Sequence, residues 1–501
     1  MFPTVRCRRL LLPALASCIV SAGFSTGLSQ TAKEKDLTAL EWQVPNEKAM
    51  LPFKDQKPIQ FVVGSPFVPE WSKLTGFWNE FEEKAVDPAT GKEVVRKVVK
   101  IKVPLGLTQA PPVPPENPMT YQKWLLGKQL FFDGVLCSDG SVSCASCHDP
   151  KTGYTTPTKT ATGIGGQLGG MNGPTVLNSA YNLLQFWDGR ASSLEDQCQG
   201  PPQNPVEMFD GKGHAWHLLV QRVRAKGDYS KRFLEAFGTE PTRDSIAKAI
   251  AAYERTVLIG NSIHDRADIA MKHRVLDEGS TKLEITAKDY ETALNAAVNA
   301  KDQNALQALG LDPAKDAAKV PALAAQINNG RILFFNKARC NGCHVGDNFT
   351  DNQFHNLGVG VVKGQLPADA LGRFGSQPTG HKNPALIGAF KTPPLRGLLS
   401  TGPYMHDGSE ATLEKVVDFY DKGGNANEFL DIRMRDEAAE KAYLLNKDSK
   451  GPAVQLFGKD QKPIIPLPLK LTDQEKKDLV LFMKALQSDP VDPIVADPNR
   501  K

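Results

Sequence analysis

The sequence has little net charge and almost no long hydrophobic runs. Apart from one apolar run over residues 10–20, no stretch of the 501 residues approaches the roughly 18 apolar residues that a membrane-spanning helix needs. The 60 Lys and Arg residues are balanced by 56 Asp and Glu residues, which leaves a formal charge of +4. Nucleic-acid-binding proteins normally carry a larger basic excess. The composition therefore predicts a soluble globular chain with no nucleic-acid partner and no membrane span once an export signal is removed.

The first residues are typical of such a signal. Three arginines precede the apolar run, which predicts a signal peptide over residues 1–29 and export to a bacterial periplasm. Two processing sites fit the pattern. A lipoprotein-like string ends at Cys18 and would leave an acylated N-terminus, whereas the small residues at 27–29 fit ordinary cleavage. A lipid anchor at Cys18 therefore stays an open alternative.

Cysteine is scarce, yet four of the eight cysteines fall into two copies of one pattern. The two strings are Cys144-Ala-Ser-Cys147-His148 and Cys340-Asn-Gly-Cys343-His344. In haem c, two such thiols form thioethers with the vinyl groups, and the adjacent imidazole coordinates the iron. Zinc half-sites are the alternative, but a structural zinc module keeps its ligands close together, and these strings lie in different halves of the chain. We therefore predict two covalently bound haem c groups.

Two cysteines remain outside the signal and the haem strings, Cys137 and Cys198. In an oxidising compartment, a lone pair of cysteines more often forms a disulfide than two free thiols. We predict a disulfide between them.

The segments before the two haem strings are duplicated. Residues 127–133 read GKQLFFD and residues 330–336 read GRILFFN. Each predicts a short apolar helix that leads into a haem attachment site, as in two related domains in tandem. Further helices are predicted over 245–258 and over 472–487, where a Thr and a Glu three residues apart form a capping box.

Convincing strand patterns are confined to residues 58–63 and 93–105. The predicted fold is therefore mainly α, with two tandem cytochrome c-like haem domains and an N-terminal extension of mixed or irregular structure. The expected segments are the signal peptide (1–29), the extension with its Pro-rich linker (30–118), the first haem domain (119–265), a connector (266–320), the second haem domain (321–490) and a tail (491–501).

The sixth coordination position of a haem iron separates catalysis from electron transfer. Between Asp149 and Phe186, after the first haem string, there is no His and a single Met, Met171. The first haem therefore lacks an obvious local sixth ligand, which favours a catalytic site.

Several longer motifs accompany the haem strings. They are NGPT at 172–175, QFWDGR at 185–190, KTPPLR at 391–396, TGPYMHDG at 401–408 and TLE at 412–414. Together these motifs resemble the bacterial dihaem cytochrome c peroxidase and MauG family over residues 119–265 and 321–487. The resemblance implies a haem peroxidase that uses hydrogen peroxide.

The resemblance assigns roles to residues of the first domain. Glu207 matches the distal carboxylate of the family, which moves a proton between the peroxide oxygens so that the O–O bond breaks heterolytically. Gln197 and Pro201 match its neighbours in the distal pocket. Trp187 matches a tryptophan between the haems, where an oxidisable indole can relay an electron hole. The plainer alternatives are a solvated surface carboxylate for Glu207 and a core aromatic for Trp187.

The resemblance also implies a calcium ion between the haems. Asn172, Thr401 and Pro403 match its ligands in the family, partly through backbone carbonyls. Such hard oxygen donors suit calcium.

Two departures from the peroxidase branch point to the MauG-like branch. Typical dihaem peroxidases carry a His on the loop after the first haem string, which blocks the iron until the second haem is reduced, and this chain has none there. The second haem of that branch has an axial Met, where this chain has Tyr420. A tyrosinate is a hard anionic ligand that favours oxidised iron. Met405 and His406 are rival ligands by residue type.

Three functions remain open. The first is a periplasmic peroxidase that forms a high-valent dihaem state and oxidises an external donor, either a small redox protein or a protein substrate. The second is a MauG-like oxidase that modifies Trp or Tyr residues of a partner protein, although the surface tryptophan that MauG has two residues before its second haem string is Ala338 here. The third is a non-enzymatic dihaem electron-transfer protein, which the open sixth position and Glu207 disfavour.

Overall fold

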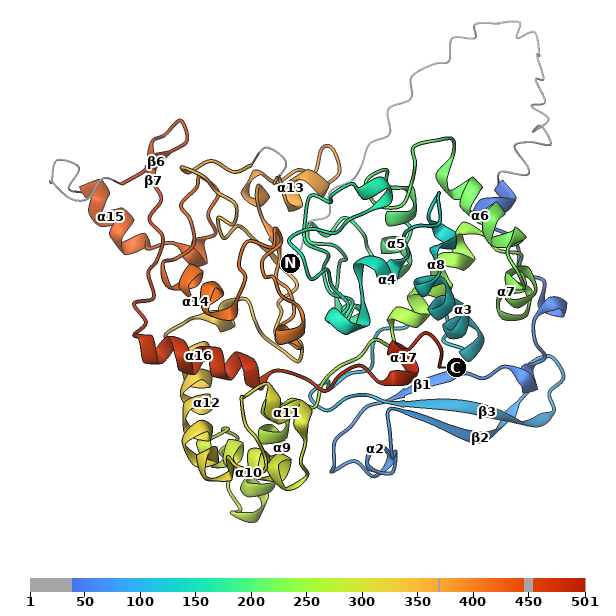
Figure 1. Ribbon diagram of the computed structural model, residues 1–501, viewed down its shortest axis with the longest axis horizontal. Coiled ribbons are helices and arrows are strands. Elements are labelled where there is room, and N and C mark those ends of the chain that lie inside the picture. Colours follow the sequence, from blue (N-terminus) through green and yellow to red (C-terminus); the bar gives the residue numbers. More distant parts are fainter. Residues whose placement is uncertain (1–37, 368–369, 446–453, 501) are drawn as a thin grey trace, which may run out of the picture.

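The computed structural model of the chain describes residues 38–367, 370–445 and 454–500. The predicted signal peptide and the alternative lipid anchor at Cys18 lie outside these residues. Figure 1 shows two mainly helical halves side by side, which we call the first unit (119–265) and the second unit (321–490). None of the helices in the described ranges combines the length and apolar character that a bilayer crossing requires.

Helices dominate both units, and the mainly α prediction is confirmed. The helices of the first unit are α3 (Tyr121–Phe132), α4 (Cys144–Cys147), α5 (Leu194–Gln197), α6 (Ala215–Ala225), α7 (Tyr229–Phe237) and α8 (Arg243–Glu254). Those of the second unit are α12 (Val320–Phe335), α13 (Arg373–Ser376), α14 (Leu413–Asp421), α15 (Glu437–Leu445) and α16 (Asp473–Ala485). Two short strand pairs, β4 (Phe354–His355) with β5 (Phe390–Lys391) and β6 (Leu456–Phe457) with β7 (Lys462–Pro463), also lie there.

The duplicated segments form equivalent helix crossings. A Cβ atom on Gly127 of α3 would lie 1.8 Å from the carbonyl oxygen of Ala249 on α8. A Cβ atom on Gly330 of α12 would lie 1.9 Å from the carbonyl oxygen of Asp478 on α16. Only glycine permits such a close approach of two helix backbones. The same residue therefore fixes the same crossing in both units, as expected of tandem haem domains.

Helix ends follow local capping signals. The predicted helix over 472–487 is α16, and the side chains of Thr472 and Glu475 form the expected capping box at its start. The predicted helix over 245–258 is α8, which starts two residues earlier because Thr242 and Ser245 form a capping box there.

The N-terminal extension contains a small sheet and the short helix α2 (Pro69–Ser72). Strands β1 (Ile59–Val62) and β3 (Glu93–Lys102) confirm the two predicted strands, and they pair in parallel. A third strand, β2 (Trp78–Val86), pairs antiparallel with β3 and was not predicted. Its residues are mostly exposed, so it lacks the alternation of apolar and polar side chains that would have revealed it.

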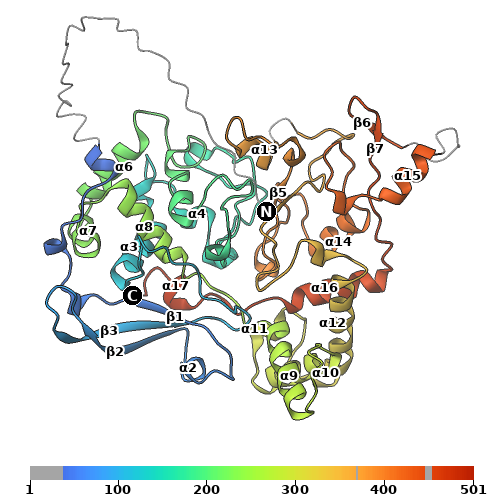
Figure 2. The same ribbon diagram turned by 180° about the vertical axis from the view of Figure 1, so that it is seen from behind.

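The connector forms α9 (Ile263–Asp277), α10 (Ala287–Asn299) and α11 (Gln303–Gln307). Tyr290 and Leu294 of α10 share a buried core with Ile327 of α12 and Phe482 of α16, so the connector is packed onto the second unit. Both views place these helices beneath the second unit and the three-stranded sheet beneath the first (Figures 1 and 2).

The C-terminal tail (491–500) runs from the second unit back to the first. After α16 the chain crosses beneath the two units and forms α17 (Pro493–Ala496) against the first (Figure 2). The buried Lys128 of α3 donates hydrogen bonds of 2.6 and 2.7 Å to the carbonyl oxygens of Ile494 and Arg500. The Tyr253 hydroxyl donates to the Val495 carbonyl oxygen at 3.1 Å. The C-terminal residues thus link the two units.

Candidate functional site: two cavities and the wall between them

The histidines of the two haem strings are oriented in the same way. Nδ1 of His148 lies 3.1 Å from the carbonyl oxygen of Tyr154, and Nδ1 of His344 lies 2.7 Å from that of Phe349. Both carbonyl-bearing residues have a φ of 54°, in the left-handed region that non-glycine residues rarely adopt. A backbone carbonyl on Nδ1 directs the other ring nitrogen, Nε2, toward a metal. The two strings therefore present matching proximal ligands.

The first cavity has a volume of about 90 Å³ and contains the first haem string. Glu207, Gln197 and Pro201, which the resemblance placed in one distal pocket, line it together with Cys144, Cys147 and His148. Among the described residues that line it, His148 is the sole histidine. The two attachment thiols and the oriented His148 imidazole at one cavity fit a covalently attached haem.

Glu207 is held at the edge of this cavity by a neighbour on the same loop. Its Oε1 accepts a hydrogen bond of 2.6 Å from the Asn204 side-chain amide. Burial raises the pKa of Glu207 above its ordinary value, against the opposing effects of the Arg190 charge and the Asn204 hydrogen bond. A carboxylate whose pKa is raised toward neutrality can both accept and return a proton, as general acid–base catalysis requires.

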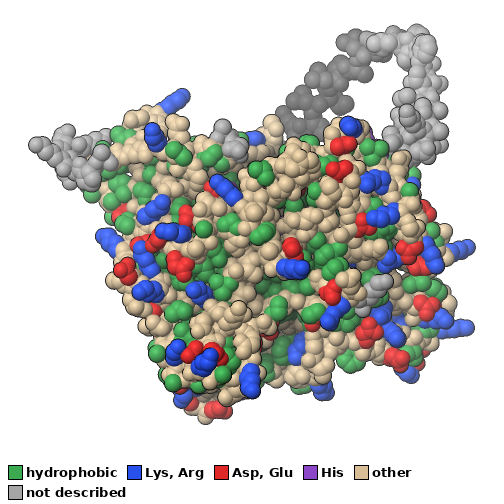
Figure 3. Space-filling view, viewed as in Figure 1, with side chains coloured by type: hydrophobic (Ala, Val, Ile, Leu, Met, Phe, Trp, Pro, Cys, Tyr) green, Lys and Arg blue, Asp and Glu red, His purple; other side chains and the backbone are tan. Residues whose placement is uncertain are grey.

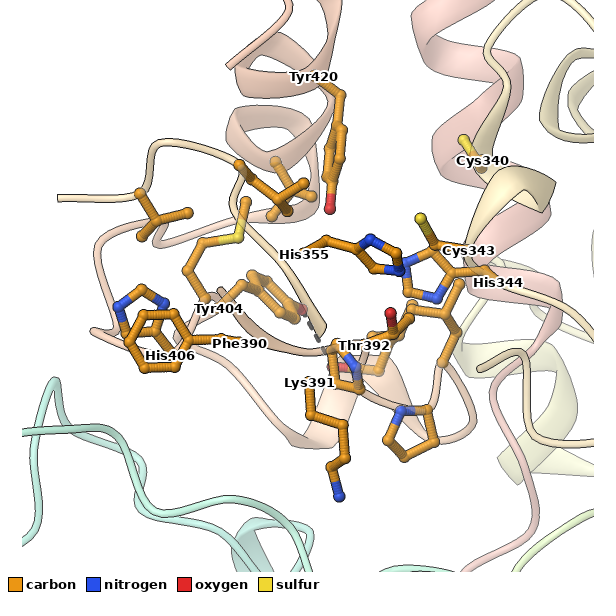
Figure 4. Close-up of a pocket in the computed structure, with 18 of the residues that line it drawn as sticks. Cys340, Cys343, His344, His355, Phe390, Lys391, Thr392, Tyr404, His406 and Tyr420 are labelled. Carbon is orange, nitrogen blue, oxygen red and sulfur yellow. Dashed lines mark hydrogen bonds between the residues drawn. The ribbon is translucent and has the colours of Figure 1, made fainter. Parts of the chain in front are cut away.

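The second cavity is larger, about 510 Å³, and contains the second haem string. Figure 4 shows Tyr420 extending from α14 with its hydroxyl directed toward Cys343. Burial raises the pKa of the Tyr420 hydroxyl, so its phenolate needs a nearby cation such as a ferric ion. The room, the attachment string and the phenol together fit a haem c with a His344 and Tyr420 ligand pair.

The rival ligand His406 lies beside Phe390, away from Tyr420 (Figure 4). The His406 ring stacks on Phe390 with 3.6 Å between centroids, and it meets the Trp187 ring edge-on at 6.5 Å. Burial lowers the pKa of His406 to about 4, so the ring is neutral at ordinary pH. Met405 also lines the cavity. These contacts bind His406 to the inter-unit side of the cavity, whereas Tyr420 lies on the side of the attachment string, near Cys343.

The residues matched to a calcium site also meet at this cavity. Asn172, Thr401 and Pro403 all line it, although the first belongs to the first unit. The Asn172 side-chain amide donates to the Thr158 carbonyl oxygen at 3.0 Å, which fixes the direction of its other end, the amide oxygen. The oxygen atoms of these residues are of the type that calcium prefers, and the calcium site stays a prediction.

A thin wall separates the two cavities. The residues that line both of them are Pro174, Thr175, Asn182, Phe186 and Lys391. Trp187 follows Phe186 and lines the larger cavity. Its indole Nε1 donates a hydrogen bond of 2.8 Å to the Asn172 carbonyl oxygen, and its own carbonyl oxygen accepts one of 2.8 Å from the Lys391 backbone. Trp187 is thus held between the units, as expected of a relay residue.

A charged cluster that the sequence did not reveal lies beside the second haem string. His355 lies between two carboxylates, 2.7 Å from Asp431 and 2.9 Å from Asp351. Burial alone lowers the pKa of His355, but hydrogen bonds to its neighbours, led by Asp431, overcome this effect and raise it. The two carboxylates therefore favour the protonated form of the ring at this cavity. No motif spacing could have shown this, because Asp431 is far from His355 in the chain.

The structure contradicts the predicted disulfide. Cys137 and Cys198 are both free thiols and both buried. The Cys137 thiol donates to Asp139 at 3.1 Å, whereas the Cys198 thiol lines the first cavity and donates to the Ala247 carbonyl oxygen at 3.4 Å. The number of cysteines does not show where their side chains point, and each thiol here has a hydrogen-bond partner of its own.

Two units that each carry a haem c attachment string and an oriented proximal histidine define a dihaem c-type cytochrome. Comparison with known proteins places it more narrowly. Residues 121–273 match the family described as di-haem cytochrome c peroxidase. The methylamine utilization protein MauG of Methylorubrum extorquens is 30% identical over 404 residues, 80% of this chain and 88% of that protein. The cytochrome-c peroxidase IdrP1 of Denitromonas iodatirespirans is 31% identical over 417 residues, 79% of this chain and 88% of that protein.

The fold agrees with these matches. A crystal structure of a MauG-like protein associated with microbial copper homeostasis is similar with a TM-score of 0.55 at 25% identity, and the match covers 78% of this chain and 97% of that one. The chain belongs to the dihaem cytochrome c peroxidase and MauG family, a family of haem oxidoreductases, and this membership implies two haem c groups.

Proposed function

We propose that the protein is a periplasmic dihaem peroxidase of the MauG-like, Tyr-ligated branch, which reacts with hydrogen peroxide and oxidises an external donor. The observation that carries the proposal is the lining of the first cavity, where Glu207 faces the first haem string and His148 has no second histidine to compete with it. A bound haem supplies redox-active iron that can take up oxidising equivalents from peroxide.

In this proposal the residues of the first cavity handle the proton. The carboxylate of Glu207 takes a proton from one peroxide oxygen and returns it to the other, so that water can leave. Asn204 positions that carboxylate through the 2.6 Å hydrogen bond. Gln197 and Pro201 shape the space in which peroxide binds.

Residues of the wall and of the second cavity share the oxidising equivalents. Trp187 carries a hole between the units, because its indole is oxidisable and its hydrogen bonds fix its position. His344 and Tyr420 hold the second iron, and a tyrosinate ligand favours its oxidised form. A calcium ion on Asn172, Thr401 and Pro403 ties the two units together next to Trp187.

The donor is either a small redox protein or a protein substrate. A MauG-like oxidation of Trp or Tyr residues in a partner protein is the second candidate, supported by Tyr420 and by the absence of a second histidine among the residues lining the first cavity. Ala338, at the position where MauG has its surface tryptophan, is only 5% exposed and lines the second cavity, so a partner would need another route for electrons. Electron transfer without catalysis is the third candidate.

Rapid mixing of peroxide with the fully oxidised protein tests the proposal. We expect a fast change in the haem absorption spectrum without prior reduction, together with one high-spin and one low-spin ferric signal in electron paramagnetic resonance. Two low-spin signals and no reaction with peroxide would favour the electron-transfer function. The rate at which candidate donors restore the resting spectrum separates a small redox protein from a protein substrate.

A further inference from the structure

The wall between the cavities contains a buried ammonium group that the proposed mechanism does not use. Lys391 of β5 is 7% exposed and lines both cavities. Its Nζ donates one hydrogen bond, of 2.9 Å, to the carbonyl oxygen of Leu184. An ammonium has three donors. Among the described residues no ion pair involves Lys391, and burial is the one cause that shifts its pKa, with no carboxylate acting on it. Lys391 thus brings an unpaired positive charge to the cavities.

Burying such a charge without an anion is costly. The cost is visible in the lysine itself, because burial lowers the pKa of Lys391 to about 8. Figure 4 shows the side chain extending away from Tyr420 and His344, toward the side on which the first unit lies. An anion placed in either cavity would satisfy the two unused donors and offset the cost.

Two other buried lysines make the contrast clear. Lys123 is also 7% exposed, and burial lowers its pKa to about 8. However, its Nζ donates to the Asn117 side chain and to the Pro118 carbonyl oxygen, and the residue lines neither cavity. Lys128 donates to two carbonyl oxygens of the tail. Lys391 differs from both because its free donors lie at a cavity wall.

The chemistry of haem supplies the missing anion, since its two propionate side chains are carboxylates. We propose that the Lys391 ammonium pairs with a haem propionate at the wall shared by the two cavities and raises the reduction potential of that haem. Neutralising a carboxylate beside the iron removes negative charge that would favour the ferric state, and the effect is strong in a partly dry site. The inference depends on the two haem groups and does not depend on peroxidase activity.

The test compares Lys391→Met and Lys391→Arg with Lys123→Met as the matched control, and it measures the midpoint potential of each haem without peroxide. In Lys391→Met we expect the ferric-to-ferrous ratio of one haem to rise at least tenfold at a fixed ambient potential, which for one electron is a fall of about 59 mV. Lys391→Arg keeps the charge and should restore the potential. Lys123→Met should leave both potentials unchanged, whatever it does to thermal stability.

The haem that responds identifies the source of the carboxylate. A shift confined to the high-spin signal assigns the propionate to the His148 haem, and a shift confined to the low-spin signal assigns it to the His344 haem. If Lys391→Met does not fold, Lys391→Gln removes the charge but keeps a donor and carries the same expectation. Unchanged potentials in the folded neutral variant would overturn the proposal, even if the protein reacts with peroxide as proposed above.

Discussion

The indole Nε1 of Trp187 donates a 2.8 Å hydrogen bond to the carbonyl oxygen of Asn172. This bond joins the proposed relay residue to the proposed calcium site, and both contact the second unit. The Asn172 backbone N–H donates to the His406 carbonyl oxygen at 2.8 Å, across the boundary between the units. Metal binding and communication between the haems are therefore expected to depend on each other.

Calcium removal should disturb both haems. We expect chelation to slow the spectral response to peroxide severalfold. The rate should recover when calcium is added back, but not when magnesium is added, because magnesium prefers a smaller and more regular oxygen shell. Asn172→Ala should behave like the chelated protein and should not respond to calcium. If metal analysis shows that the chelator has removed calcium and the rate is still unchanged, the site on Asn172, Thr401 and Pro403 holds no functional ion.

Loss of the Glu207 carboxylate should slow the reaction with peroxide. In Glu207→Gln we expect the rate of the peroxide-dependent spectral change to fall about 10²–10⁴-fold, because an amide cannot accept the peroxide proton. The haem content should stay at two per chain. Asp210→Asn, an exposed carboxyl on the same loop, is the control and should react normally.

The same residue predicts a pH dependence. Burial raises the pKa of Glu207, so the carboxylate form is lost as the pH falls through a value above that of an ordinary glutamate. The rate in the wild-type protein should therefore decrease on acidification in this range, and the slope should vanish in Glu207→Gln. A slope that persists in the variant would assign the titration to another group.

Substitution of Tyr420 should change the second haem alone. In Tyr420→Met we expect the midpoint potential of this haem to rise, because a neutral thioether stabilises ferric iron less than a phenolate does. Two haems per chain should remain, since the thioether bonds are untouched. Tyr404→Phe is the matched control: its hydroxyl lines the same cavity but donates to the Leu398 carbonyl oxygen at 3.0 Å. An unchanged potential in Tyr420→Met would favour Met405 or His406 as the ligand.

The duplicated glycines should be intolerant of alanine. A Cβ atom at Gly127 or Gly330 would overlap a helix carbonyl, so each crossing would have to open. We expect Gly127→Ala and Gly330→Ala each to reduce the free energy of unfolding by about 1–3 kcal/mol, measured by denaturant titration. Gly76→Ala is the control, because nothing lies within 4 Å of its added carbon and its φ is not in the left-handed region. Equal stability of all three variants would mean that the helix backbones do not approach this closely.

Cys137 and Cys198 should be free thiols in the purified protein. Alkylation after unfolding without a reductant should modify both, as mass spectrometry of the peptides would detect. If neither residue is modified, the two cysteines form the disulfide that their number alone suggests.

Several features of this protein were accessible from the sequence because they are local. The haem strings place three reacting groups within five residues, and covalent attachment demands that spacing wherever the string lies in the fold. Helix α16 could be predicted to its first residue because Thr472 and Glu475 cap it within one turn. Strand β2 could not, because its pairing with β3 rather than its own pattern holds it in place.

The relationships between distant residues were decided by the tertiary structure. Lys391 stands in a motif that the sequence displays, but only packing of the two units places it at both cavities, and the charge of His355 depends on Asp431 in another element. Cys137 and Cys198 are the opposite case: their number suggests a disulfide, but packing leaves both as free thiols. Spacing along a chain encodes local chemistry, whereas burial and long-range contacts determine which groups finally meet.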